Sequence, residues 1–109
     1  MYSAGVASVK PRVITGNREI VVQPEGPLTS VTAEGFKRAL LRTIENYDCP
    51  LLLDLSEVPY CSSAGFHAVM LAAQVLNQRG QKLRLTNASA SVRKAMEIVN
   101  LAALVEIVV

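Results

Sequence analysis

Residues 51–66 have the sequence LLLDLSEVPYCSSAGF, which joins an apolar run to the start of an amphipathic pattern. The run at 51–55 is almost continuously apolar, as in strands covered on both faces, so it predicts the central strand of a sheet. Ser62 and Ser63 stand just before apolar residues at helical spacing, and either hydroxyl suits a helix N-cap. Residues 64–65 are small, as a tight turn requires. The segment therefore predicts a strand, a tight turn and a helix in succession.

The rest of the chain alternates between strand and helix patterns. Two β-type runs, 13–14 and 20–22, flank Gly16-Asn17, a good two-residue hairpin turn. Further short strands are predicted at 83–85 and 104–109. Apolar residues recur at three- and four-residue intervals in three predicted helices: Phe36, Leu40, Leu41, Ile44 and Tyr47; Phe66, Val69, Met70, Ala73 and Leu76; and Val92, Ala95, Met96 and Val99.

This order predicts an α/β fold with a mixed β-sheet. Strands that alternate with helices pair in parallel through right-handed crossovers, whereas the opening hairpin adds an antiparallel strand. Thr29, Ser30 and Thr32 are candidate caps for the first helix, and Ser89 and Ser91 for the third. Gly80 stands where a left-handed C-terminal cap would end the second helix. We expect the helices to pack their apolar stripes against the sheet.

Composition limits the chain to one domain. It has 109 residues, of which 50% are hydrophobic, and a net charge of +2, which favours neither nucleic acid nor an anionic membrane as a partner. We expect a single domain over 1–109 with a loose start at 1–9. No signal peptide or run of about 18 apolar residues is present, so we expect a cytoplasmic protein with no direct membrane insertion. Cys49 and Cys61 are expected to be reduced thiols.

Motifs for most enzyme chemistries are absent. The chain lacks GxxxxGK[ST], GxGxxG and GxSxG, and its single histidine, His67, cannot build a His-rich metal site. We therefore expect no cofactor, no metal and no enzymatic activity. A serine hydrolase built on Ser63, His67 and Asp54 is the catalytic alternative, but nothing in the sequence orients the imidazole. Asp54 is expected to bond backbone groups in the turn that follows it.

Residues 52–66 resemble the signature of STAS domains, the fold of bacterial anti-sigma factor antagonists. In that family an apolar strand ends in Asp-Leu-Ser, and Asp-Ser-(Ser/Thr/Ala)-Gly-Leu then opens a helix. Aligned on Gly65, Ser63 falls on the family's phosphoacceptor serine, and Ser62 replaces the usual Asp and becomes a rival acceptor. The resemblance also covers the loop at 25–29 and the segment at 80–86.

The resemblance implies a non-catalytic module switched by phosphorylation. The unphosphorylated protein would bind an anti-sigma factor that is also a serine kinase, and a PP2C-type phosphatase would reverse the phosphorylation of Ser63. A phosphate adds about −1.5 to −2 charges at the helix start, which would oppose close docking. The expected partner surface consists of Leu28, Thr29, Ser30, Ser62, Ser63, Ala64, Gly65, Phe66 and His67.

A second interpretation is a STAS subunit of a membrane transporter complex. Such a subunit would bind its partner constitutively and need no phosphate cycle. The presence of Ser62 in place of the usual Asp slightly favours it.

Overall fold

The computed structural model describes residues 12–15, 19–47 and 50–108, and within them it shows a five-stranded mixed sheet. The expected loose start at 1–9, the Gly16-Asn17 turn and Cys49 lie outside the described residues. The strands follow the chain in the order β1-β2-β3-β4-β5, with β1 antiparallel to β2 and the other neighbours parallel. Their bounds are β1 Arg12–Thr15, β2 Ile20–Gln23, β3 Leu51–Asp54, β4 Leu83–Thr86 and β5 Val105–Val108. The predicted mixed sheet with an antiparallel opening pair is confirmed.

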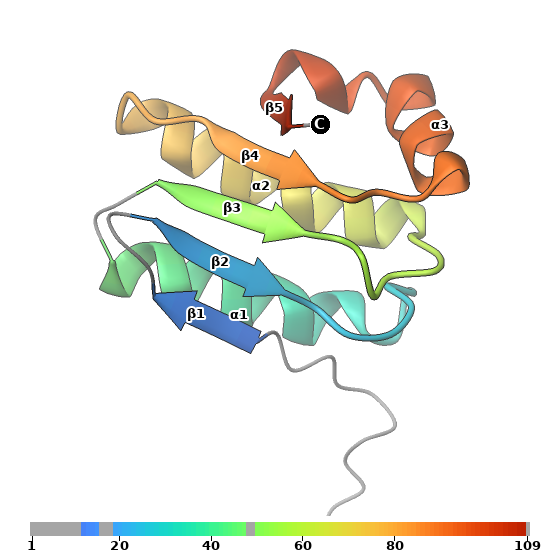
Figure 1. The fold of residues 1–109 in the computed structure, drawn as a ribbon, viewed down its shortest axis with the longest axis horizontal. Helices are drawn as coiled ribbons and strands as arrows, with labels where there is room; N and C mark the ends of the chain where they lie inside the picture. Colours follow the sequence, from blue (N-terminus) through green and yellow to red (C-terminus); the bar gives the residue numbers. More distant parts are fainter. Residues whose placement is uncertain (1–11, 16–18, 48–49, 109) are drawn as a thin grey trace, which may run out of the picture.

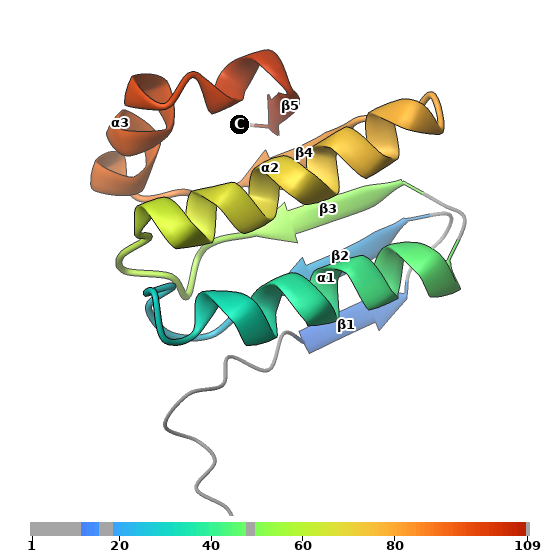
Figure 2. The ribbon, with the colours of Figure 1, turned by 180° about the vertical axis from the view of Figure 1, so that it is seen from behind.

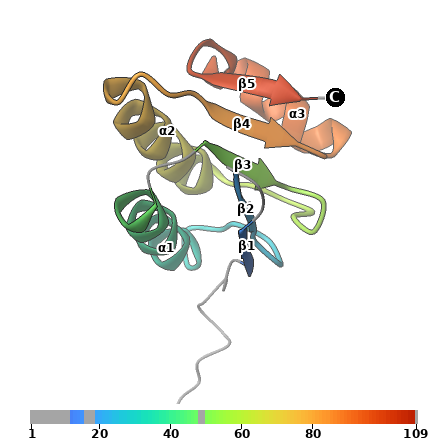
Figure 3. The same ribbon diagram turned by 60° about the vertical axis from the view of Figure 1, so that its left-hand side comes forward.

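Two long helices cover one face of this sheet. The helices are α1 Ala33–Asn46, α2 Ser63–Gln78 and α3 Ala90–Ile98, followed by a 3-10 turn, η2, at Leu101–Ala103. Figure 2 shows α1 and α2 side by side across the sheet, and Figure 3 shows both on the same side of the strands. Helix α3 follows the tip of β4 (Figure 1). The core lies between the sheet and α1 and α2, where Phe36 and Leu40 have no exposed surface.

The prediction that the 51–55 strand is covered on both faces is wrong. Leu51 and Leu53 are buried, whereas Leu52 and Asp54 are partly exposed, and β2 and β4 show the same alternation. Because side chains alternate between the two faces of a strand, one face of the sheet packs on the helices and the other stays partly open. Leu52 lies on this partly open face but is as apolar as its buried neighbours. The sequence of the strand therefore appears apolar throughout.

The helix ends follow local chemistry. Gly80 has a φ of +75° just after α2, as its predicted cap position requires. Ser89 caps α3 by accepting the N–H of Val92 at 3.3 Å. Tyr47 and Val99 lie just past the ends of α1 and α3 and are 41% and 47% exposed, so their predicted place in the buried stripes is wrong.

Helices α1 and α2 begin at the same end of the sheet. Strands β2 and β3 are parallel, and each is followed by a loop and then a helix on the same face. The loops that precede α1 and α2 are therefore neighbours, although α1 and β3 lie between them in the chain. This adjacency positions the candidate site.

Candidate functional site

The two neighbouring serines at the start of α2 have different roles. Ser62 is the N-cap: its backbone is extended, and its Oγ accepts the N–H of Gly65 at 3.3 Å. Ser63 is the first helical residue and its side chain is exposed. No acceptor or donor for the Ser63 hydroxyl occurs among the described residues. The serine aligned with the phosphoacceptor is thus the free one of the pair.

A short ladder of backbone hydrogen bonds ties the loop before α1 to the loop before α2. The N–H of Leu28 donates to the carbonyl of Tyr60 at 2.8 Å, and the N–H of Ser62 donates to the carbonyl of Leu28 at 2.7 Å. Leu28 and Cys61 form an isolated parallel bridge between these hydrogen bonds. The ladder places residues 28–30 beside the start of α2, as the resemblance implied.

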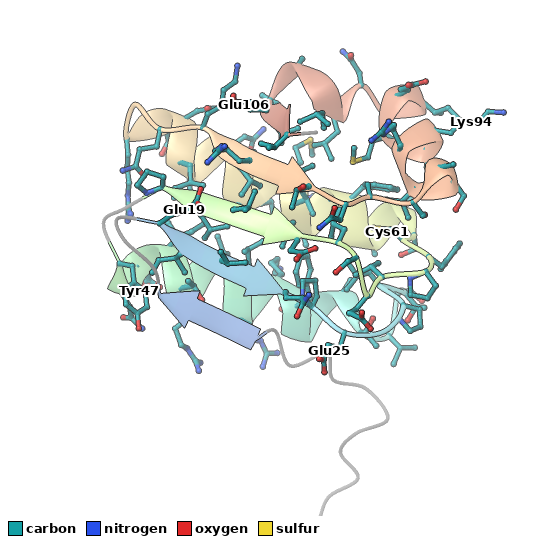
Figure 4. The ribbon with its side chains drawn as sticks, viewed as in Figure 1. Glu19, Glu25, Tyr47, Cys61, Lys94 and Glu106 are labelled. Atoms are coloured by element: carbon teal, nitrogen blue, oxygen red, sulfur yellow. The ribbon has the colours of Figure 1, made fainter. Side chains whose placement is uncertain are left out.

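Gly65 allows α2 to approach this ladder closely. A Cβ added at Gly65 would lie 2.7 Å from the Sγ of Cys61 and 3.0 Å from the Cβ of Leu28. Figure 4 marks Cys61 on the segment that joins β3 to α2. Burial raises the pKa of the Cys61 thiol to about 12, so the thiol stays protonated at neutral pH. Gly65 and Cys61 therefore support the site from beneath.

Two threonines fix the loop before α1. The Oγ1 of Thr32 accepts the N–H of Thr29 at 2.8 Å and donates to the carbonyl of Pro27 at 2.9 Å. The Oγ1 of Thr29 accepts the N–H of Val31 at 3.2 Å. These bonds hold the backbone of the loop that precedes α1, and neither threonine hydroxyl caps the helix itself. Ser30 and Val31 are left exposed at the tip of a fixed loop.

Ser63 and His67 stand on a ridge between two hollows. The first hollow, here called the charged groove, runs between α1 and α2 and has a volume of about 460 Å³. The second, here called the apolar groove, lies between α2 and the segment after α3 and has a volume of about 220 Å³. The charged groove is lined by Ser30, Ala33, Glu34, Lys37, Ser63, Ala64, His67, Ala68 and Leu71, and the apolar groove by Ser63, Phe66, His67, Met70, Val99 and Leu101.

The structure divides the predicted partner surface into two layers. Ser30, Ser63, Ala64 and His67 line the charged groove together. Leu28, Gly65 and Phe66 are buried, so their side chains support the surface from below and cannot supply broad direct contact. Thr29 and Ser62 are half-buried, and their hydroxyls are engaged in the hydrogen bonds given above.

Eight residues that line the two grooves were missed by sequence reasoning: Ala33, Glu34, Lys37, Ala68, Met70, Leu71, Val99 and Leu101. Glu34 and Lys37 belong to the polar side of the α1 pattern, and Met70 and Val99 were assigned to buried stripes. The exposed end of α1 carries an ion pair in which the Nζ of Lys37 lies 3.2 Å from Glu34, with the Nε of Arg38 at 3.5 Å. Hydrogen bonding and attraction from Lys37, aided by Arg38, lower the pKa of Glu34. Only the packing of α1 beside α2 reveals that these charges face Ser63.

Asp54 is held in a structural hydrogen-bond cluster. Its Oδ1 accepts the backbone N–H of Ser56 at 3.0 Å and the amide of Asn87 at 3.2 Å, and its Oδ2 accepts the amide of Gln23 at 3.3 Å. Burial raises the pKa of Asp54, but these hydrogen bonds outweigh it and the pKa is lowered. The predicted bond to the following turn is confirmed. No hydrogen bond joins Asp54 to His67 within the described ranges, so the orienting contact that the hydrolase alternative needs is missing there.

Neither a cluster of metal-ligating side chains nor a membrane-spanning helix is found in the described part of the chain. No three His, Cys, Asp or Glu side chains of the described residues gather where they could hold a metal ion. No helix among the same residues is long and apolar enough to cross a bilayer. Most of the basic side chains of the second half are exposed, and Figure 4 shows Lys94 pointing away from the domain. Arg84 is the exception, since it is half-buried and pairs with Glu19.

Comparisons with known proteins agree with this geometry. The chain is 32% identical over 74 residues to the Bordetella bronchiseptica protein BtrV, whose name describes it as an anti-sigma factor antagonist; the match covers 68% of this chain and 64% of BtrV. The fold matches an anti-sigma factor antagonist from Mycobacterium paratuberculosis with a TM-score of 0.82 at 19% identity, over 94% of this chain and 86% of that one. It also matches phosphorylated SpoIIAA of Bacillus with a TM-score of 0.69 at 16% identity, over 91% of both chains. The model of the STAS domain matches residues 8–108. Nearly the whole chain is thus covered by one family model, and this protein belongs to the STAS domain family.

Proposed function

We propose that this protein is an anti-sigma factor antagonist that works by partner switching. With Ser63 unmodified it binds an anti-sigma factor that is a serine kinase, and phosphorylation of Ser63 releases it. A PP2C-type phosphatase restores the binding form. The observation that carries the proposal is the exposed, unengaged hydroxyl of Ser63 on a ridge between two grooves. The name of BtrV and the phosphorylated form of SpoIIAA support it.

The geometry favours Ser63 over Ser62 as the acceptor. The Oγ of Ser62 already accepts the N–H of Gly65, and a phosphate there would disrupt the cap and have to fit beside the buried ladder. Losing an N-cap costs about 1 kcal/mol. Ser63 is exposed in the first helical turn, where a phosphate would meet the positive end of the helix dipole. Phosphorylation of Ser63 therefore leaves the fold intact.

The switch acts through desolvation and bulk at a docking surface. In the unmodified protein, the ridge offers a partner the uncharged hydroxyl of Ser63 beside the apolar groove. A phosphate on the ridge carries about −1.5 to −2 charges. Burying that charge against a partner that offers no cation of its own costs several times the ~1.4 kcal/mol that changes affinity tenfold. The proposed partner is therefore released without a large conformational change.

The test compares partner capture by four versions of the full chain in lysate of the native cell. Wild type and Ser63→Ala are expected to retain a serine kinase, identified by mass spectrometry, and Ser63→Asp to lose it. Ser91→Asp is the matched control, because it adds the same charge to the first turn of α3, away from both grooves. The captured kinase, supplied with ATP, is then expected to phosphorylate Ser63 and not Ser62.

Two results would refute the proposal. If all four versions retain the same partners, Ser63 is not a switch, and a transporter subunit among those partners would establish constitutive binding instead. If the kinase modifies Ser62 in the wild type, the assignment of the acceptor is wrong.

A further inference from the structure

Two side chains that can donate hydrogen bonds to a phosphate, Lys37 and His67, line the charged groove together with Ser63. Lys37 projects from α1 and His67 from α2, and both line the groove that Ser63 also lines. His67 follows Ser63 by four residues in α2, a spacing that puts the two side chains on the same helix face about 5–6 Å apart at Cβ. Helices α1 and α2 lie side by side (Figure 2), so Lys37 faces this helix surface from the opposite wall.

We propose that Lys37 and His67 form a clamp for the phosphate of phosphorylated Ser63. This inference rests on the proposed function and concerns the regulation of the same site. A phosphate has three acceptor oxygens and attracts a cation more strongly than one carboxylate does. The ammonium of Lys37 donates to the phosphate from α1, and the imidazolium of His67 donates from α2. The phosphate then lies in the charged groove and does not point into solvent.

The ion pairs of α1 allow Lys37 to leave Glu34 for the phosphate at a small cost in free energy. Lys37 is bound to Glu34 in the unmodified protein, at 3.2 Å, with about a third of the Lys37 side chain exposed. Arg38 contacts the other carboxylate oxygen of Glu34, at 3.5 Å. When Lys37 turns to the phosphate, Glu34 keeps Arg38 as its partner and is not left alone. Glu34 is also the acidic side chain that lines the groove. Its carboxylate repels the phosphate, and the attraction of Lys37 and His67 has to exceed that repulsion.

The clamp extends the effect of phosphorylation beyond added charge. A phosphate drawn between α1 and α2 fills the surface beside Ser30 and Ala64, where the proposed partner would dock. It therefore changes the shape of the charged groove as well as its potential.

The experiment places phosphoserine at position 63 during synthesis of the full chain, so no host kinase is needed. The second ionisation of the phosphate, near about pH 6 in an ordinary phosphoserine, is followed by ³¹P NMR. In the otherwise wild-type protein we expect its midpoint to lie about half a pH unit lower than in Lys37→Met and in His67→Gln, the size expected of exposed ion pairs. Lys82→Met removes an exposed lysine outside the groove and should leave the midpoint unchanged. Thermal unfolding checks that each variant is folded.

Salt supplies a second measurement. Raising NaCl to about 1 M should remove most of the difference between wild type and both variants, because salt screens exposed charges at this distance. Equal midpoints in all versions overturn the clamp, and a change in only one of the two groove variants overturns the two-residue form of it. Because the phosphate is installed synthetically, these results are independent of partner capture. A capture experiment in which all four versions retain the same partners refutes the proposed function but does not move the ³¹P midpoint.

Discussion

Replacing Gly65 by alanine tests whether α2 depends on its close approach to the ladder beneath it. The new Cβ would lie 2.7 Å from the Sγ of Cys61, far inside the ~3.5–4.0 Å at which non-bonded heavy atoms attract. Overpacking costs about 1–3 kcal/mol, and an approach as short as 2.7 Å belongs to the upper part of that range, about 2–3 kcal/mol. The better helix propensity of alanine returns about 1 kcal/mol at most. We therefore expect Gly65→Ala to lower the free energy of unfolding by about 1–2 kcal/mol.

Urea unfolding followed by circular dichroism measures this loss, and Cys61→Ala separates its cause. If the sulfur is the main obstacle, the double variant should be more stable than the sum of the two single variants predicts, with a coupling of about 1 kcal/mol. Rescue should be incomplete, because the Cβ of Leu28 still lies 3.0 Å away. Gly80→Ala is the control: its φ of +75° makes alanine unfavourable, but nothing lies within 4 Å, so Cys61→Ala should not rescue it.

The reasoning fails if Gly65→Ala is as stable as the wild type. It also fails if the coupling with Cys61 is absent, since the loss would then come from somewhere other than this contact.

Three further results are expected. The pKa of Asp54 is lowered from its ordinary value of 3.8. Its carboxylate therefore contributes stability above pH 3.8, and this contribution is lost as the pH falls through the pKa of the folded state. Between about pH 5 and pH 2, the urea midpoint of the wild type should fall more steeply than that of Asp54→Asn. Ser62→Ala should lose about 1 kcal/mol of stability with its N-cap, whereas Ser63→Ala should change the urea midpoint little; equal losses would contradict the division of roles between them. With the Cys61 thiol at a pKa of about 12, a Cys49→Ala variant should react with iodoacetamide at pH 8 only slowly when folded and quickly in urea, and rapid labelling of the folded protein would show that Cys61 is not protected.

The sequence could predict the elements, and the place of Ser62 and Ser63 at a helix start, because both depend on local patterns. Apolar spacing defined α1 and α2, and the glycine at 80 marked the end of α2. The sequence could not predict features that depend on which faces of the helices and of the sheet pack against each other. Leu52 is as apolar as its neighbours but lies on the partly open face, and Lys37 is one polar residue among many until α1 packs beside α2.

Ser62 and Ser63 have separate structural roles. This separation explains how the charge of the surface at Ser63 could change while the fold beneath it does not. Ser62 holds the helix start through both its hydroxyl and its carbonyl, since the N–H of Phe66 also donates to that carbonyl at 3.0 Å. Gly65 and the Leu28 ladder fix the same turn from below. None of these contacts uses the Ser63 side chain, so a phosphate there would add charge without removing a structural hydrogen bond. Had the exposed and capping roles fallen on one serine, each phosphorylation would also cost the helix its cap, and the two forms would differ in stability as well as in binding.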